Sequence, residues 1–281
     1  MKLVARGVTL TWPRRPLIMG IVNLGADSFS GDGIVEIDRA IEHARGLVRD
    51  GADVIDIGAE SARTNRGAIS EEEEAAQLIR FIERWDGDAL LSINTWRPGV
   101  ARAALAVGGH LLNDIGALPT DENARICAAT GAALLIMHSI GEPKVPHTHA
   151  GYDDIMARLD EFFTEKLALT EAAGVPRDSI VLDPGIDFAK QRADNLRIYR
   201  GLDRLAQFER PLLLPVSRKT VIGEVLGIET PAERDAGTVA CIVQGMLRGA
   251  AIFRVHNVRA AAQAVRIIEA VESPITAPDR A

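Results

Sequence analysis

Eight short apolar segments, rich in strand-forming residues, alternate with amphipathic helical segments along almost the whole chain. Continuous apolar runs of this kind are typical of strands that are buried on both faces of a parallel sheet. Strand–helix alternation implies parallel pairing through right-handed crossovers, and eight units fit a closed barrel better than an open doubly wound sheet. We therefore predict an α/β fold, a (βα)8 TIM barrel. The predicted strands are Leu17–Asn23, Asp53–Gly58, Ala89–Asn94, His110–Asn113, Ala132–His138, Ser179–Asp183, Leu212–Ser217 and Ala251–His256.

Helical patterns fill the intervals between these strands. Residues 37–50 place aliphatic side chains on one face, and residues 153–173 form the longest amphipathic segment. Ser70 precedes four glutamates and is a predicted N-cap. Gly108, Gly131 and Gly174 stand where helices should stop, as glycines after a helix commonly do. We predict one domain over residues 1–281, with a core from about residue 17 to 272 and a flexible tail from about 273 to 281.

Composition excludes several classes of protein. The formal net charge of −7 argues against nucleic acid as the main partner, because phosphate backbones need a basic face. Cys127 and Cys241 lack metal-ligand spacing and indicate a reducing compartment. We expect no signal peptide, and no membrane span, because no apolar stretch reaches about 18 residues.

Nearly every predicted strand ends in a polar residue. In a barrel these ends converge on one face, which is where barrel enzymes keep their active sites. One polar strand end could simply mark the exit from the core, but a full set favours a site. The residues are Asn23, Asp56 with Glu60, Asn94, Asn113, His138, Asp183, Ser217-Arg218-Lys219, and Arg254 with His256.

The chemistry of this set suggests a pocket for a heterocycle and an anion. Asn113 and Asp183 offer the donors and acceptors that match an aminopyrimidinone edge, whose N–H groups face a carboxylate. Positive charge gathers near one end and suits a phosphate or diphosphate; its sources are Arg218, Lys219, Arg254 and His256.

Two glycine-containing loops follow early strands, and long loops in compact domains are usually functional. On the first loop, Asp27 stands close to Asn23, and the two could hold Mg²⁺ through oxygen ligands, with Asp32 as a further candidate. Phe29 on the same loop could close over a substrate.

An ordered set of motifs runs from about residue 17 to 270. These are Met19-Gly-Ile-Val-Asn23 with Asp27-Ser-Phe-Ser30, Asp56-Ile-Gly-Ala-Glu-Ser61 with Arg63, Asn113-Asp-Ile115, Met137-His138 with Gly141-Glu-Pro143, Asp183-Pro-Gly185 with Phe188 and Lys190, Ser217-Arg-Lys219 with Ile222-Gly223, and Arg254-Val-His256. Together they resemble the dihydropteroate synthase family, in order and spacing. The resemblance implies a (βα)8 transferase of folate biosynthesis. Such an enzyme joins 6-hydroxymethyl-7,8-dihydropterin diphosphate to p-aminobenzoate, an arylamine, and releases diphosphate.

The resemblance also implies roles for individual residues and an assembly. The implied pterin ligands are Asn94, Asn113, Asp183 and Lys219, and the implied diphosphate ligands are Asn23, Arg254 and His256, with Mg²⁺ at Asn23. The implied p-aminobenzoate side holds Phe29, Arg63 and Ser217, and the implied catalytic residues are Asp27, Arg63 and Lys219. Members of the family are usually cytoplasmic homodimers.

The sequence departs from the family pattern mainly on the loops. The departures are Gly25-Ala26 where Thr-Pro is usual, Ala62 and Thr64 where Thr and Pro are usual, Asn94 where Asp is usual, and Asp187 and Ala189 where two glycines are usual. These changes leave three hypotheses: an active synthase, a transferase with an altered acceptor amine, and a catalytically silent pterin-binding paralogue. The predicted diphosphate-binding cations argue against a related pterin-using methyl transferase.

Overall fold

A computed structural model describes the chain except for residues 13–14, 26–32, 61–67, 142, 146–150 and 274–281. Its centre is a parallel sheet of eight strands, in the spatial order β8-β7-β6-β5-β4-β3-β10-β9. The sheet closes into a barrel where Leu182 and Leu212 form a parallel bridge and Leu182 N donates to Pro211 O at 3.0 Å. The strands are β3 (Leu17–Asn23), β4 (Val54–Gly58), β5 (Leu90–Asn94), β6 (Leu111–Asp114), β7 (Ala133–Met137), β8 (Ile180–Asp183), β9 (Leu213–Leu214) and β10 (Ile252–Val255).

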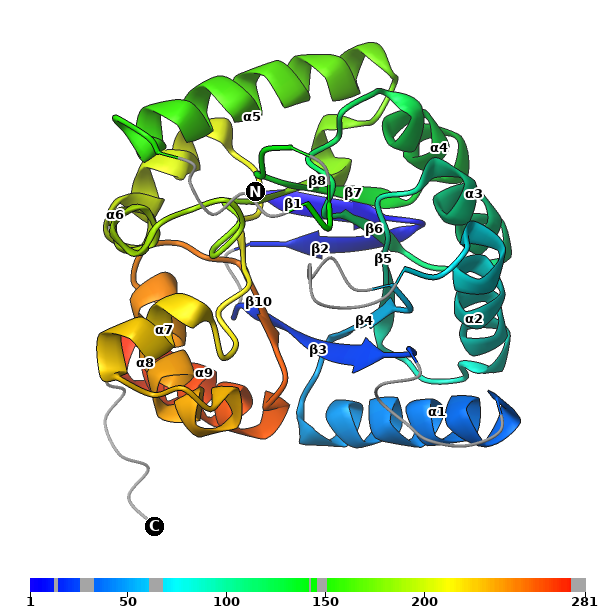
Figure 1. The fold of residues 1–281 in the computed structure, drawn as a ribbon, viewed down its shortest axis with the longest axis horizontal. Helices are drawn as coiled ribbons and strands as arrows, with labels where there is room; N and C mark the ends of the chain where they lie inside the picture. The colour runs from blue at the N-terminus through cyan, green and yellow to red at the C-terminus, as the bar shows by residue number, and fades with distance from the viewer. Residues whose placement is uncertain (13–14, 26–32, 61–67, 142, 146–150, 274–281) are drawn as a thin grey trace.

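Helices surround the strands in a ring, as Figure 1 shows. The predicted barrel is therefore confirmed, and every predicted strand is present with ends that differ by a few residues at most. The α-helices are α1 (Gly33–Asp50), α2 (Glu71–Arg84), α3 (Pro98–Val107), α4 (Glu122–Thr130), α5 (Ile155–Ala172), α6 (Arg192–Gly201), α7 (Thr220–Leu226), α8 (Asp235–Met246) and α9 (Val258–Glu272). Short 3₁₀ segments are η1 (Arg177–Ser179), η2 (Leu202–Phe208) and η3 (Pro231–Arg234).

The predicted helix ends are confirmed except at one glycine. Ser70 caps α2, because its side chain accepts a hydrogen bond from Glu73 N at 3.1 Å. Gly131 and Gly174 follow α4 and α5 with φ of 73° and 87°, in the left-handed region that favours glycine. Gly108 ends α3, but its backbone is extended, and Gly109 takes the left-handed conformation instead.

A two-stranded antiparallel hairpin precedes the barrel and was not predicted. It consists of β1 (Lys2–Ala5) and β2 (Val8–Thr11) and projects onto the middle of the ring in Figure 1. Leu3 and Ala5 are buried in one cluster with apolar side chains from the lower part of the barrel, among them Leu17 and Leu213. The hairpin therefore covers the amino-terminal end of the barrel and leaves the opposite end for a site.

The barrel interior changes from apolar to polar along the strands. Side chains two residues apart on a strand share a face. The inward cluster at the lower level includes Val54, Leu111, Val181 and Ile252. Two residues further along the same strands stand Asp56, Asn113, Asp183 and Arg254. The carboxyl ends of the strands thus carry a polar layer directly above a dry apolar floor.

Among the described helices, none is long and apolar enough to cross a lipid bilayer.

Candidate active site

Asp56 is fully buried in the polar layer and accepts hydrogen bonds from three neighbouring strands. Ser92 Oγ and Asn113 Nδ2 donate to its Oδ1 at 2.6 and 3.1 Å. Asn94 Nδ2 and Arg254 Nε donate to its Oδ2 at 3.2 and 2.7 Å. A buried carboxylate is tolerated only when it is paired and hydrogen-bonded, and Arg254 supplies the opposite charge. Asp56 therefore joins β4, β5, β6 and β10 around one anionic centre.

Asn94 and Asn113 lie side by side across the β5–β6 register, and both are almost fully buried. A carboxylate only accepts hydrogen bonds, so both amides must turn their NH₂ groups toward Asp56. Their carbonyl oxygens then face away from it, and neither has a hydrogen-bond partner among the described residues. The pair presents two buried acceptors with unused capacity, which fits a ligand edge that carries N–H groups.

Asp183 ends β8 and brings a carboxyl group into the same layer. Its Oδ1 accepts a hydrogen bond from Gly185 N at 2.7 Å. Burial raises the pKa of Asp183 to about 6, although Gly185 N–H and the cations Lys219, Lys190 and Arg254 oppose the shift. Gly185 is required here because a Cβ atom would lie 2.0 Å from His138 O. The structure thus places Asp183 beside the predicted pterin ligands in a desolvated position.

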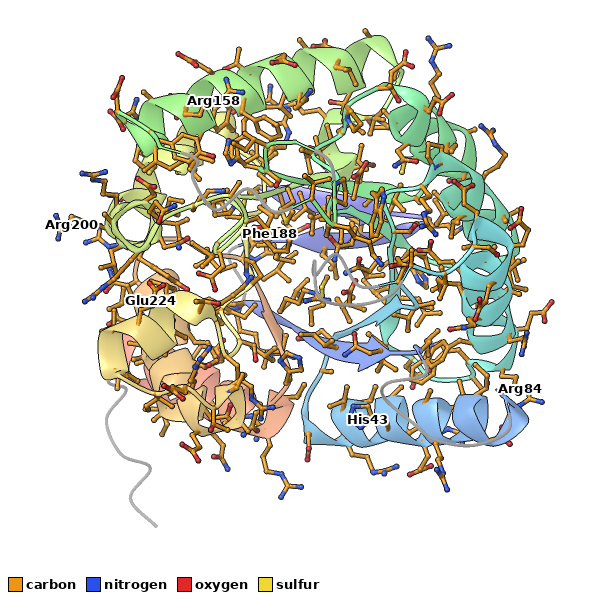
Figure 2. All side chains as sticks on the ribbon, in the orientation of Figure 1. His43, Arg84, Arg158, Phe188, Arg200 and Glu224 are labelled. Carbon is orange, nitrogen blue, oxygen red and sulfur yellow. The ribbon has the colours of Figure 1, made fainter. Side chains whose placement is uncertain are left out.

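Lys219 reaches the same region from the loop after β9. Its Nζ donates to Ile186 O at 2.7 Å and lies 4.8 Å from the centre of the Phe188 ring. Figure 2 shows Phe188 inside the ring of helices, whereas Arg84 and Arg200 lie at its outer edge. Phe188 is therefore a further candidate site residue, since it sets the position of the Lys219 ammonium and offers an aromatic face.

Ser217, His256 and Asn23 complete the predicted set at the described strand ends. Ser217 Oγ lies 2.8 Å from His256 Nδ1, and the same hydroxyl oxygen accepts from His256 N at 3.1 Å. Asn23 is exposed at the end of β3, which pairs with β10, the strand of Arg254. The residues predicted for the diphosphate side therefore stand on adjoining strand ends.

Two residues predicted at the mouth by their strand-end position have structural roles instead. His138 is fully buried, and its ring packs edge-on against Phe162 of α5 at 4.8 Å, outside the barrel. Lys190 Nζ lies 2.8 Å from His138 Nδ1 and holds the ring in place. Burial lowers the pKa of His138 to about 2. Arg218 forms an ion pair with Asp235 of α8, with Nε–Oδ1 2.7 Å, so its guanidinium does not serve the anion pocket as predicted.

Asp187 connects the loop after β8 to two helices. Its carboxylate accepts from the backbone N–H groups of Thr220 and Val221, the first residues of α7, and from Asn195 Nδ2 of α6 at 3.1 Å. Asp187 has a φ of 68°, a conformation that costs a non-glycine residue energy. The hydrogen bonds offset this cost and hold the start of α7, where Lys219 stands.

Replacing Asp187 should test this connection. We expect Asp187→Ala to lower the free energy of unfolding by about 1–3 kcal/mol, because charge-assisted hydrogen bonds are lost. Asp187→Gly should lose about 1 kcal/mol less, because glycine tolerates the left-handed backbone. Urea denaturation of the two variants measures both effects, and equal stability of all three proteins would contradict the assignment.

Several predicted residues lie outside the described part of the chain. They are Asp27, Phe29, Asp32, Ala62, Arg63 and Thr64. Glu60 is the described residue that directly precedes the second loop in the sequence. Glu60 is buried, its Oε2 accepts from Ile69 N at 2.8 Å, and its Oε1 pairs with Lys144.

Sequence reasoning missed one member of the site, Ser92. It included Asp56 in the strand-end set but gave it no role. Both interrupt otherwise apolar strands, and β4 and β5 place them directly opposite each other. A charged or polar residue inside a buried strand needs hydrogen-bond partners, and this requirement could have identified both residues from the sequence.

A buried acid, two oriented amides and convergent cations at the mouth of an α/β barrel define a polar small-molecule site. Comparison with known proteins shows which family has such a site: a family model described as pterin binding enzyme matches residues 19–256. Dihydropteroate synthase of Escherichia coli strain K12 is 37% identical over 277 residues, which cover 97% of each chain. The chain therefore belongs to the dihydropteroate synthase family.

Solved structures agree with this assignment. Xanthomonas albilineans dihydropteroate synthase with 4-aminobenzoic acid matches at a TM-score of 0.89 and 37% identity, covering 98% of this chain and 99% of that one. The same enzyme in complex with 7,8-dihydropteroate matches at a TM-score of 0.87 and 36% identity, covering 98% and 100%.

Proposed function

We propose that the protein is a dihydropteroate synthase, a transferase that joins 6-hydroxymethyl-7,8-dihydropterin diphosphate to p-aminobenzoate and releases diphosphate. One observation carries the proposal: three buried acceptor groups, on Asn94, Asn113 and Asp183, lie at the end of the barrel that bears the active site in this fold, and Lys219 is close enough to Asp183 for its charge to act on that carboxyl group. The pterin edge presents N–H groups that match these acceptors. The relatives with this name agree in sequence and fold over nearly their whole length.

The diphosphate binds on the side of Asn23, Arg254 and His256. Arg254 keeps its Nε on Asp56, and this contact holds the guanidinium at the strand end, where its remaining N–H groups face the leaving group. Ser217 Oγ likewise holds His256 in position, through contacts with its ring Nδ1 and its backbone N–H. The charge on diphosphate is thus met by groups whose positions are already fixed, as efficient transition-state stabilisation requires.

Mg²⁺ is proposed to bind with the diphosphate at Asn23. Among the described residues, no cluster of three His, Cys, Asp or Glu side chains is placed to hold a metal ion. Mg²⁺ commonly takes one or two protein oxygen ligands and completes its shell with water and substrate phosphates, so the exposed Asn23 amide fits this mode. When bound, the ion neutralises diphosphate charge. Asp27 is a proposed neighbour of this site.

The reaction breaks the C–O bond between the pterin methylene and diphosphate and forms a C–N bond to the arylamine, which then loses a proton. Positive charge develops on the pterin as diphosphate departs. Asp183 and Asp56 supply negative charge beneath the ring, and the apolar barrel floor excludes water from below. Lys219 and the loop residues Asp27 and Arg63 are the proposed catalytic residues, and Phe29, Arg63 and Ser217 form the proposed p-aminobenzoate side.

A product assay tests the proposal directly. Purified protein with the pterin diphosphate, Mg²⁺ and p-aminobenzoate should form dihydropteroate. Absence of product at high enzyme concentration overturns the proposal. A panel of other amines in the same assay separates the altered-acceptor hypothesis, which requires a better acceptor than p-aminobenzoate.

The silent-paralogue hypothesis is not favoured. It rested largely on Asn94, but the structure shows that the Asn94 amide keeps an acceptor oxygen away from Asp56. Turnover of the unmodified protein excludes this hypothesis.

The proposed assembly is a cytoplasmic homodimer. The apolar groove between α8 and α9 supports a paired surface, because Val239, Val243, Ala264 and Ile267 line it and Ile267 is 64% exposed. Analytical ultracentrifugation should give a dimer for the protein and a monomer for Ile267→Glu. A monomeric parent protein overturns the proposal.

A further inference from the structure

We propose that Asp56 is a positioning residue that fixes the amides of Asn94 and Asn113 with their oxygens toward the ligand, and so makes the pocket selective for a ring edge that donates. The inference deepens the proposed function and rests on pterin as the ligand. It assigns ligand selectivity to a buried side chain that lies behind the amides. Asn94 then serves as an uncharged acceptor.

The orientation of the two amides follows from the chemistry of their shared neighbour. Asp56 Oδ2 receives Asn94 Nδ2 at 3.2 Å, and Asp56 Oδ1 receives Asn113 Nδ2 at 3.1 Å. A flipped amide would place its oxygen against a carboxylate oxygen, which is repulsive. Ser92 and Arg254 also donate to Asp56, so the carboxylate is surrounded by donors and held in one place.

The consequence appears on the other side of the amides. Asn94 Oδ1 and Asn113 Oδ1 are buried and have no hydrogen-bond partner among the residues that the structure describes. Buried acceptors of this kind are costly when left unpaired, so a ligand that donates to them is strongly preferred over one that presents oxygen. The pocket should therefore separate a 2-amino pteridine from its 2-oxo counterpart.

A matched acid–amide pair exists on the outer face of β6, the strand that carries Asn113. Asp114 is fully buried and accepts from Asn123 Nδ2 at 2.9 Å and from Gly116 N at 2.8 Å. It follows Asn113 directly and so faces away from the barrel interior. Asp114→Asn thus removes a buried, amide-bonded carboxylate, as Asp56→Asn does, but from the outer face of β6 and without touching the pocket.

Calorimetric binding of two probes tests the inference. The probes are 6-hydroxymethylpterin and 6-hydroxymethyllumazine, in which oxygen replaces the 2-amino group; neither carries diphosphate. We expect the protein to bind the pterin at least 100-fold more tightly. In Asp56→Asn the new side-chain NH₂ forces one neighbouring amide to flip, so the preference should fall below about 10-fold, partly through tighter lumazine binding. Asp114→Asn should keep the original preference within about 3-fold.

Two further outcomes decide the inference. Asn94→Leu removes one acceptor and leaves Asp56 in place, so it should also reduce the preference; where Asp56→Asn does not fold, this variant tests the acceptor orientation that Asp56 is proposed to fix. An unchanged preference in a folded Asp56→Asn or Asn94→Leu protein overturns the inference and leaves pterin binding standing. Failure of the folded parent protein to bind the pterin overturns the proposed function together with the inference.

Discussion

Asp183→Asn is expected to make the protein more stable at pH 7.5 while it weakens pterin binding at least 100-fold. Burial is the largest cause that raises the pKa of Asp183, to about 6 from an ordinary value of 3.8. Folding therefore favours the protonated acid, so this group's stabilising contribution is complete below pH 3.8 and is lost as the pH rises through about 6. At pH 7.5 the ionised carboxylate costs the fold about 1–3 kcal/mol, and a neutral asparagine avoids that cost.

The same ionised carboxylate is what the ligand requires. Asparagine can still accept from Gly185 N, which Asp183 Oδ1 does at 2.7 Å, but it presents an NH₂ group where the pterin needs an acceptor. We expect pterin affinity to fall at least 100-fold. For the unmodified protein, affinity should be constant above pH 7 and should fall about tenfold per pH unit below about 6, as Asp183 becomes protonated.

Urea denaturation and calorimetry across pH 4 to 8 measure both effects. The difference in stability between Asp183→Asn and the parent should be largest above pH 7 and should vanish near pH 4, because both side chains are then neutral. Burial lowers the pKa of Lys190 to about 7 and the Asp183 charge opposes this shift, so the substitution also changes the contribution of Lys190. A variant that is less stable than its parent at pH 7.5 would show that ionised Asp183 supports the fold.

The alternation of side chains between the two faces of a strand explains how much of the site the sequence predicts. Continuous apolar runs located the strands, and the barrel fold then placed their polar ends on one face. Counting every second residue along each strand, starting from the apolar floor, would also have identified which strand-end side chains face into the barrel. Val54 leads to Asp56 and Leu111 to Asn113, both inward, whereas His138 follows the inward Met137 and faces α5. The prediction for His138 was wrong because it used the residue's position at the strand end and did not consider which face of the strand the side chain is on.

Other features depend on contacts that no local pattern reveals. Arg218 and Lys219 are adjacent in sequence, yet one pairs with Asp235 on α8 and the other reaches Ile186 O. Arg218 has a φ of 56°, and this turn directs the two side chains apart. The hairpin of β1 and β2 escaped prediction because its strands have four residues each and its role, closing the barrel floor, arises only in the folded chain.

Lys219→Met should reduce kcat/KM by about 100- to 1,000-fold, the second large effect that we expect. The Lys219 ammonium stands between Ile186 O and the Phe188 ring, and its charge acts on Asp183. Methionine keeps the length and much of the apolar contact but removes the positive charge. Loss of one preorganised charged donor from an active site typically has this magnitude, about 3–4 kcal/mol in transition-state stabilisation.

Arg218→Met is the matched control, because it removes a cation from the neighbouring position of the same loop. In the parent protein the Arg218 guanidinium is bound to Asp235 through Nε and Nη2, at 2.7 and 3.1 Å, away from the mouth of the barrel. We expect kcat/KM within about 3-fold of the parent and a lower free energy of unfolding, by about 1 kcal/mol for a partly exposed ion pair. Steady-state kinetics and urea denaturation of both variants give the comparison. Equal losses of activity would place Arg218 in the anion pocket after all, because only a shared electrostatic role makes the two cations equivalent.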